Sequence, residues 1–205
     1  AEDIKRIEES AEAHRLQKIS ERIKNNWAVV TFKKMQTMKP IFLLGYMGCG
    51  KTTVGKNIAG KMGLEFLDTD DLIEKKHRQT IAEIFSEVGE NQFREMEREV
   101  LHNIVDYNDC IISTGGGMPC FFDNLALMNE NGTTIFLDVS IEELVHRLYY
   151  KGNKRPLLQG KNEQQLYEYI KKSIEERLPF YSQAQIRISA DNTNATIDRI
   201  LQLLG

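Results

Sequence analysis

The chain has 205 residues, of which 41% are hydrophobic and 28% charged, with a formal net charge of −3. This composition is typical of a folded domain and excludes collagen-like and disordered chains. The longest apolar run, residues 40–44, is far shorter than the roughly 20 residues that cross a membrane. The first residues carry mixed charges and do not resemble a secretory signal, so we expect a cytoplasmic protein without membrane contact.

Cysteine spacing and charge distribution narrow the function further. Cys49, Cys110 and Cys120 form no Cys-x-x-Cys pair or Cys/His cluster, which predicts reduced thiols and no zinc site. Residues 1–40 hold 9 Lys and Arg against 6 Asp and Glu, whereas residues 41–205 hold 18 against 24. An acidic main body argues against nucleic-acid binding, so an anionic substrate must be held by a few specific cations.

The N-terminal 40 residues differ in pattern from the rest. Residues 1–24 place apolar side chains at spacings of three to five among charges, which predicts one amphipathic helix ending near residues 25–26. Residues 27–40 show no strong pattern and are interpreted as a linker. Two interpretations of this helical extension stay open: a fusion remnant without catalytic role, or a helix that dimerises or docks. We expect a monomer, with any self-association mediated by this helix.

From residue 41 onward, short apolar runs alternate with helical patterns. Several runs are continuously apolar, as expected for strands buried on both faces. The alternation predicts a three-layer α/β domain over residues 41–205, with a parallel sheet between two layers of helices. Strands are expected near residues 41–44, 64–67, 109–113, 133–137 and 185–189.

Residues 45–52 fit the phosphate-loop pattern G-x-x-x-x-G-K-[ST], with an apolar strand before and a helical pattern after. Glycines let backbone N–H groups surround phosphate oxygens, and the following helix N-terminus favours negative charge. Lys51 would reach the β- and γ-phosphates, and Thr52 would offer its hydroxyl to Mg²⁺. The pattern therefore predicts binding of ATP or GTP with Mg²⁺.

Other residues decide which phosphate-loop protein this is. The guanine-reading Asn-Lys-x-Asp sequence of GTP switches is missing, which favours a small-molecule kinase. Asp68 and Asp70 follow the second strand, and an extended spacing of two would put both carboxylates on one side. One could organise water around Mg²⁺ while the other accepts a hydroxyl proton. The alternative is that Asp70 caps a helix over residues 71–77.

Three further features have a functional and a plain interpretation each. Residues 115–117 are consecutive glycines at a strand end, where a ligand could approach the backbone or the chain could simply turn. Arg94, taken alone, looks like a solvated helix residue. Residues 151–160 form a polar loop with three cations, either a lid that brings an arginine to the phosphates or a solvated loop.

Taken together with Glu176–Tyr181, these motifs resemble the shikimate kinase family over residues 41–204. The resemblance implies a P-loop NTPase fold of the nucleoside-monophosphate-kinase type, with sheet order 2-3-1-4-5 and a lid loop. It implies transfer of the γ-phosphoryl group of ATP to the 3-hydroxyl of shikimate, giving shikimate 3-phosphate and ADP. That reaction belongs to chorismate and aromatic amino acid biosynthesis and uses Mg²⁺.

The resemblance also implies roles for residues that bind the acceptor. Asp70 would bind the ring hydroxyls and serve as the base. Arg94 and Arg177 would hold the shikimate carboxylate, for which planar guanidinium groups are suited. Gly116 would offer its backbone N–H to the substrate.

On the nucleotide side, the resemblance implies that Thr52 binds Mg²⁺ directly and that Asp68 holds it through water. Arg155 matches a lid arginine that reaches the phosphates, and it would act with Lys51 and Asp70 as a catalytic residue. Arg147 and residues 191–194 sit in suitable places for the adenine but are not diagnostic. The nucleotide-binding set is Gly48, Cys49, Gly50, Lys51, Thr52, Thr53 and Arg155.

Two other functions stay open from the sequence. A different kinase on the same fold could act on another polyol acid such as gluconate. A degenerate nucleotide-binding module could use the N-terminal helix to recruit a partner, although intact Lys51, Thr52, Asp70 and Arg155 argue against lost catalysis.

Overall fold

The computed structural model describes residues 2–13, 16–24, 27–34, 37–150 and 160–204. The chain divides into two compact units, residues 1–38 and residues 39–205. None of the described helices is long and apolar enough to span a membrane.

The N-terminal unit contains a helix and a hairpin. Helix α1 (Glu2–Ala13) precedes the antiparallel strands β1 (Leu16–Lys24) and β2 (Trp27–Lys34). The predictions of a single helix over residues 1–24 and a linker from residue 27 are therefore wrong. Ile19 and Ile23 misled the interpretation, because residues four apart share a face in a helix and in a strand alike.

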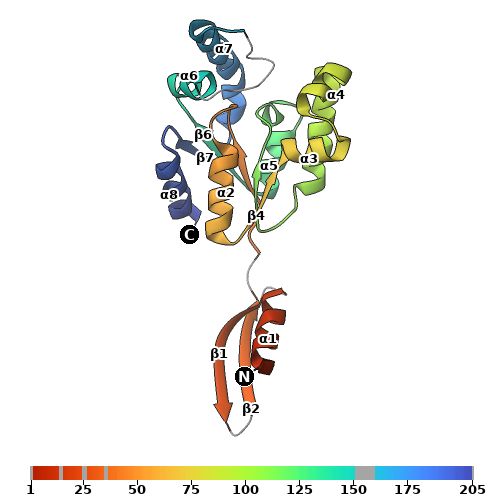
Figure 1. The fold of residues 1–205 in the computed structure, drawn as a ribbon, viewed down its shortest axis with the longest axis vertical. Coiled ribbons are helices and arrows are strands. Elements are labelled where there is room, and N and C mark those ends of the chain that lie inside the picture. Colours follow the sequence, from red (N-terminus) through yellow and green to blue (C-terminus); the bar gives the residue numbers. More distant parts are fainter. Residues whose placement is uncertain (1, 14–15, 25–26, 35–36, 151–159, 205) are drawn as a thin grey trace. The chain divides into compact units, whose positions relative to one another are not determined.

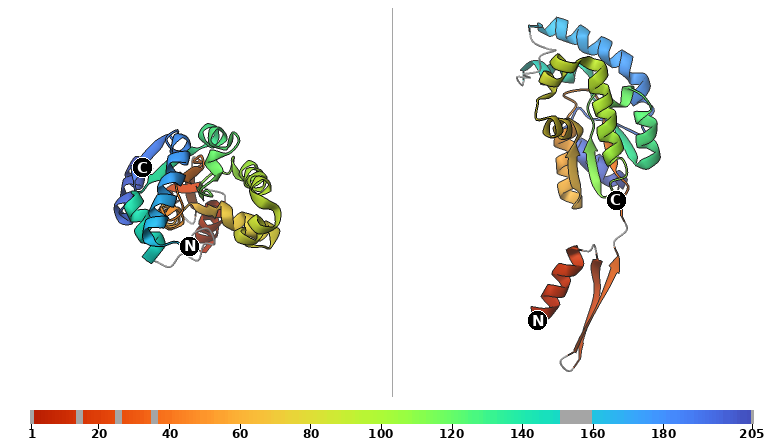
Figure 2. Two further views of the ribbon diagram at one scale, coloured as in Figure 1. Left: turned by 90° about the horizontal axis from the view of Figure 1, so that it is seen from above. Right: turned by 90° about the vertical axis from the view of Figure 1, so that its right-hand side faces the viewer.

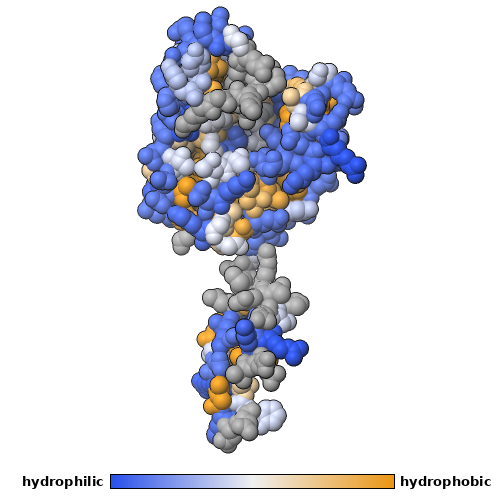
Figure 3. Space-filling view, in the orientation of Figure 1, coloured by the Kyte–Doolittle hydropathy of each residue, from blue (hydrophilic) through white to orange (hydrophobic). Residues whose placement is uncertain are grey.

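This unit has a small core. Among its residues whose burial is described, Ala11 is the one buried hydrophobic side chain, whereas Ile23, Trp27 and Val29 are well exposed. Apolar residues are visible at the surface of this unit in Figure 3. A two-stranded hairpin with one helix buries little apolar surface and is marginal on its own.

The second unit is built on a five-stranded parallel sheet, with strand order β4-β5-β3-β6-β7 (Figure 1). Counted from β3 in chain order, this arrangement is 2-3-1-4-5, the order that the resemblance implies. Every predicted strand is present, with bounds that differ by at most one residue. The strands are β3 (Ile41–Leu44), β4 (Glu65–Asp68), β5 (Cys110–Ser113), β6 (Thr133–Asp138) and β7 (Ile186–Ser189).

Helices cover both faces of this sheet, as Figures 1 and 2 show. The helices are α2 (Lys51–Met62), α3 (Thr69–His77), α4 (Ile81–Ile104), α5 (Asn124–Asn131), α6 (Ile141–Tyr150), α7 (Glu163–Tyr181) and α8 (Thr193–Leu204), with the 3-10 helix η1 at Met118–Cys120.

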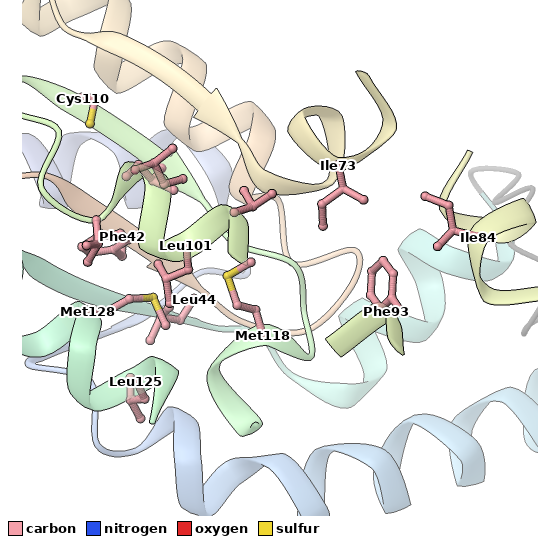
Figure 4. Close-up of a cluster of buried hydrophobic side chains, with 14 residues drawn as sticks. Phe42, Leu44, Ile73, Ile84, Phe93, Leu101, Cys110, Met118, Leu125 and Met128 are labelled. Carbon is pink, nitrogen blue, oxygen red and sulfur yellow. The ribbon is translucent and has the colours of Figure 1, made fainter. Parts of the chain in front are cut away.

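The central strand β3 shows how the layers pack. Phe42 and Leu44 point to one face, where they join buried residues of α4 and α5 such as Leu101 and Met128 (Figure 4). Leu43 points the other way, and a Cβ on Gly55 of α2 would lie 3.1 Å from it. A strand buried on both faces needs apolar residues at every position, which explains the run from Ile41 to Leu44.

Helix α4 begins at a capping box, in which the Thr80 hydroxyl accepts from the Glu83 N–H and the Glu83 carboxylate accepts from the Thr80 N–H. The helix is broken at Gly89, whose φ of 76° and ψ of 177° are not helical. The part of α4 after this break carries Arg94.

Candidate active site

A cavity of about 460 Å³ lies where β3, β4 and β5 end, at the carboxyl edge of the sheet. This edge is where open α/β sheets bind ligands. Of the residues predicted from the sequence, Gly48, Gly50, Lys51, Thr52, Thr53, Asp68, Asp70 and Gly116 line it. The other lining residues are Met47, Ser113, Thr114, Arg147 and Thr193.

The phosphate loop leads directly into α2. Gly48 and Gly50 have φ of 82° and 100°, values that glycine adopts without steric cost. The Lys51 ammonium donates to the Gly45 carbonyl at 2.8 Å and to the Tyr46 carbonyl at 3.2 Å. Because α2 begins at Lys51, its unpaired N–H groups face the loop, which suits a phosphate.

Cys49 differs from its neighbours in the loop. Its side chain is buried, and its backbone N–H donates to the Tyr46 carbonyl at 3.2 Å. It is not among the residues that line the cavity. The predicted contact of Cys49 with nucleotide is therefore the least supported of the loop set.

Asp68 is hydrogen-bonded both to Thr52, the last residue of the phosphate loop, and to the backbone of Asp70. Its Oδ2 accepts from the Thr52 hydroxyl at 2.9 Å, and its Oδ1 accepts from the Asp70 N–H at 3.1 Å. Asp68 is thus the N-cap of α3, and the alternative that Asp70 caps this helix is wrong. The expected extended spacing is also wrong, since the chain becomes helical at Thr69, but both carboxylates line the same cavity.

Two arginines from different helices reach residues 115–117, the glycine loop. Arg177 of α7 donates from Nη1 to the Gly116 carbonyl at 3.3 Å. Arg94 of α4 lies against Gly117, where an added Cβ would come within 2.4 Å of Nη1. Arg94 is only 7% exposed, so its interpretation as a solvated helix residue is wrong. The structure therefore brings both predicted arginines to one loop.

Glu97 is a buried residue that the sequence reasoning missed. It accepts from Arg94 Nη1 at 2.6 Å, and it is 1% exposed. A Cβ on Gly115 would lie 2.5 Å from Glu97 Oε1 and 2.9 Å from Asp70 Oδ1, so both carboxylates border the same glycine. Burial raises the pKa of Glu97 to about 7, an effect that Arg94 partly opposes. The sign of this pair in the sequence was that Glu97 follows Arg94 by three residues, a spacing at which side chains of a helix contact each other.

The Tyr181 side chain holds the glycine loop in place. Its hydroxyl donates to the Gly116 carbonyl at 2.5 Å, and its ring centroid lies 5.0 Å from that of Phe136. Burial raises the pKa of Tyr181, so the hydroxyl keeps its proton. Because Arg177 and Tyr181 both donate to this carbonyl, the peptide between Gly116 and Gly117 has one defined orientation.

Arg147 connects the phosphate loop with the segment after β7. Its Nη1 donates to the Cys49 carbonyl at 3.2 Å, and its Nη2 donates to the Asp191 carbonyl at 2.6 Å. Thr193, two residues after Asp191, lines the same cavity as Arg147. The two places that the sequence singled out for the adenine therefore meet at the cavity. Arg155 and residues 151–159 of the predicted lid lie outside the described residues.

Magnesium fits the residues at this edge. Among the described residues, no group of three or more His, Cys, Asp or Glu side chains could hold a metal ion by itself. Mg²⁺ at nucleotide sites keeps several waters and binds one or two protein groups plus phosphates. The Thr52 hydroxyl and the Asp68 carboxylate, 2.9 Å apart, provide those groups.

Comparison with known proteins decides the family. The family model for shikimate kinase matches residues 47–204. The chain belongs to the shikimate kinase family. It is 49% identical over 154 residues to shikimate kinase from Parabacteroides distasonis, a match that covers 75% of this chain and 89% of that one.

Solved structures of the family have the same fold. The crystal structure of shikimate kinase from Bacteroides thetaiotaomicron has a TM-score of 0.79 at 43% identity and covers 82% of this chain and 99% of its own. Shikimate kinase from Acinetobacter baumannii in complex with shikimate has a TM-score of 0.73 at 35% identity, with coverage of 82% and 93%.

Membership of the family confirms the predicted activity. The chain is a kinase that uses ATP, with Mg²⁺ as the usual cofactor, to phosphorylate shikimate in aromatic amino acid biosynthesis. The comparisons do not support the alternatives of a gluconate-type kinase or a nucleotide-binding module.

Proposed function

We propose that the cavity at the carboxyl edge of the sheet carries out in-line transfer of the γ-phosphoryl group of ATP to the 3-hydroxyl of shikimate. The observation that carries this assignment is that Asp70 lines the same cavity as Lys51 and Thr52. A carboxylate, an ammonium and a hydroxyl around one space are the groups that phosphoryl transfer needs.

The phosphates of ATP occupy the loop of residues 45–52 in this proposal. Backbone N–H groups of the loop and of the first turn of α2 surround the phosphate oxygens, and Lys51 neutralises charge on the γ-phosphate. Thr52 and, through water, Asp68 hold Mg²⁺, which supplies further charge neutralisation when bound. Arg147 and Thr193 border the space left for the nucleoside.

Asp70 acts on the acceptor. It accepts a hydrogen bond from the 3-hydroxyl and takes its proton as that oxygen attacks the γ-phosphorus. The bond from phosphorus to the β–γ bridging oxygen breaks, and that oxygen leaves with ADP. Positioning and charge stabilisation, rather than covalent chemistry by the protein, supply most of the acceleration.

The shikimate carboxylate is held by Arg94 and Arg177. Both guanidinium groups lie at the glycine loop, and they are the cations of α4 and α7 that reach it among the described residues. Gly116 adds its backbone N–H, and the peptide that follows it is held in place because Arg177 and Tyr181 both donate to the Gly116 carbonyl. A neutral acceptor would offer these two cations no charge to bind.

Arg155 is proposed to reach the transferring phosphoryl group from the lid. Arginines in this role contribute about 10³ to 10⁵ in rate. The Arg155→Ala variant should therefore lose kcat by orders of magnitude while the KM for shikimate changes little. A kcat near that of the wild type would contradict the role.

The reaction itself is tested by ADP release from Mg-ATP with purified protein. Parallel samples contain no acceptor, shikimate, gluconate or AMP. Turnover with shikimate alone is the expected result. Turnover with gluconate or AMP instead would contradict shikimate as the acceptor, and no turnover with any acceptor would contradict the activity.

We also propose that the protein is cytoplasmic and that its catalytic unit works as a monomer, since residues of one such unit suffice to line a cavity with groups for the nucleotide and the acceptor. Self-association, where it occurs, would use the N-terminal unit, whose exposed apolar residues include Ile23 and Trp27. Light scattering of the full chain with Trp27→Lys tests this. A dimer that persists in the variant would exclude this surface.

A further inference from the structure

The segment that follows η1 faces α4 with two consecutive aromatic rings. The Phe121 ring centroid lies 4.3 Å from Arg94 Cζ, and the Phe122 ring centroid lies 4.8 Å from Arg98 Cζ. Asp123 adds an ion pair of 3.0 Å to Arg98 Nη2. Arg94 and Arg98 are one turn apart on α4, so three successive residues contact two successive arginines.

The backbone of this segment is strained at the point where the rings meet the helix. Phe122 has a φ of 52°, which is the left-handed region. A bulky residue there costs about 1 to 3 kcal/mol and persists only where surrounding contacts hold it. Successive side chains of an extended segment would point to opposite sides. The left-handed turn instead lets both rings contact the same helix.

Phe121 is also tied to the glycine loop. In η1, the Met118 N–H donates to the Gly115 carbonyl at 3.1 Å and the Cys120 N–H donates to the Gly117 carbonyl at 2.8 Å. The Asn124 side chain donates to the Met118 carbonyl at 2.9 Å. These bonds make the segment a rigid continuation of the loop that carries Gly116.

The ion pairs of Arg94 do not by themselves fix the orientation of its guanidinium plane. Nη1 donates to Glu97 at 2.6 Å and Nη2 donates to Glu90 at 2.8 Å, while Nε has no hydrogen-bond partner among the described residues. Glu90 is 57% exposed, and exposed pairs hold geometry weakly. A pair to one buried carboxylate lets the guanidinium plane rotate about that bond. Three rings oppose the rotation, and Phe121 at 4.3 Å is nearer than Phe93 at 5.4 Å and Phe85 at 5.7 Å.

We propose that Phe121 is a positioning residue for this kinase: its ring fixes the plane of Arg94 relative to the glycine loop, so that the guanidinium presents its free donors to the shikimate carboxylate. Phe122 and Asp123 hold Phe121 in place through Arg98. The inference rests on the proposed role of Arg94 as a carboxylate ligand. Phe121 does not line the cavity, and the proposal predicts that it affects the affinity for shikimate but not the affinity for ATP.

The test compares Phe121→Leu with Phe121→Tyr in the full chain by steady-state kinetics. Phe121→Leu should raise the KM for shikimate about 3- to 30-fold, the range for loss of a cation–π contact, with kcat and the KM for ATP within about twofold. Phe121→Tyr keeps the ring and should restore the wild-type KM. A purely structural role would instead lower kcat or shift both KM values, which would overturn the proposal.

A double-mutant cycle separates this inference from the proposed function. In an Arg94→Ala background, Phe121→Leu should change the KM for shikimate no further. If Arg94→Ala itself leaves that KM unchanged, the carboxylate clamp is wrong. If Arg94→Ala raises it and Phe121→Leu does not, only the positioning role is wrong.

Phe122→Asn provides a second variant, which keeps the test valid if Phe121→Leu does not fold. Asparagine tolerates a φ near 52° but lacks the ring over Arg98. Its expected effect is a rise of about twofold to fivefold in the KM for shikimate, because Phe121 loses one of its supports. An unchanged KM in a folded Phe122→Asn variant would exclude the supporting contact.

Discussion

The two units of this chain bury their apolar residues to very different extents. In the catalytic unit, the central strand β3 (Ile41–Leu44) is fully buried between two layers of helices. In the N-terminal unit, the strands β1 and β2 leave side chains such as Trp27 and Val29 exposed. The comparison shows that the catalytic unit has the rigid core on which positioned side chains depend and that the N-terminal unit does not. Mutations should therefore affect the two units differently.

The largest difference should come from Asp70. Asp70→Asn removes the proton acceptor and should lower kcat by about 10² to 10⁴, because that is the contribution of a positioned general base. The matched control is Asp71→Asn, which changes an exposed residue of the same helix and should leave kcat unchanged. Near-normal turnover of Asp70→Asn would show that the proton goes elsewhere.

Glu97 should make the stability of the catalytic unit depend on pH. Its folded-state pKa of about 7 exceeds the usual value of 4.5 because of burial, so the folded state binds this proton more tightly. The free energy of unfolding should then fall as pH rises from about 4.5 to 7, by up to about 3 kcal/mol.

Denaturant unfolding of the wild type and of Glu97→Gln between pH 5 and pH 8 measures this effect. The difference in unfolding free energy between the two proteins should change with pH across that window. Glu95→Gln, an exposed change on the same helix, is the control. Parallel curves for the wild type and Glu97→Gln would contradict the shifted pKa.

Tyr181→Phe should have a smaller effect. It removes the hydroxyl that donates to the Gly116 carbonyl at 2.5 Å and should lower the unfolding free energy by about 1 kcal/mol. Because Arg177 still contacts that carbonyl at 3.3 Å, the KM for shikimate should rise only about twofold to tenfold. A change in the KM for ATP without a change in the KM for shikimate would contradict this prediction and assign Tyr181 to the nucleotide side.

The smallest effect should come from the N-terminal unit. Trp27 is exposed, so Trp27→Ser should change the unfolding free energy of the catalytic unit by less than about 0.5 kcal/mol and kcat by less than twofold. Thermal unfolding and ADP release from the same preparation measure both. A loss of activity would mean that the two units are coupled.

The same comparison explains what could be predicted from the sequence. The strands of the catalytic unit were found within one residue because short apolar runs, nearly continuous in β3, β5 and β6, alternate there with helical patterns. In residues 16–24, by contrast, a short amphipathic segment fits a helix and a strand equally well, and residues 27–34 show no strong pattern. Local periodicity settles such segments only when a core selects one face.

Whether a site residue could be predicted also depended on whether its role leaves a recognisable pattern in the sequence. The phosphate loop and the triple glycine were found because glycines at fixed spacing have a backbone reason to be there. Glu97 and Phe121 were missed because their importance comes from burial against Arg94, a residue that itself looked solvated. Asp70 was assigned to the correct edge although the local geometry, helical rather than extended, was wrong.

The central place of β3 has a consequence for how the protein is made. Ile41 pairs with Ile111 on one side and with Thr133 on the other, so both neighbours are synthesised after it. At about 5 to 20 residues per second, the strand leaves the ribosome roughly 5 to 20 seconds before its last partner exists. Until then its two edges and four apolar side chains are open to other chains. We therefore expect the nascent kinase to need protection of β3 until residue 133 has been made.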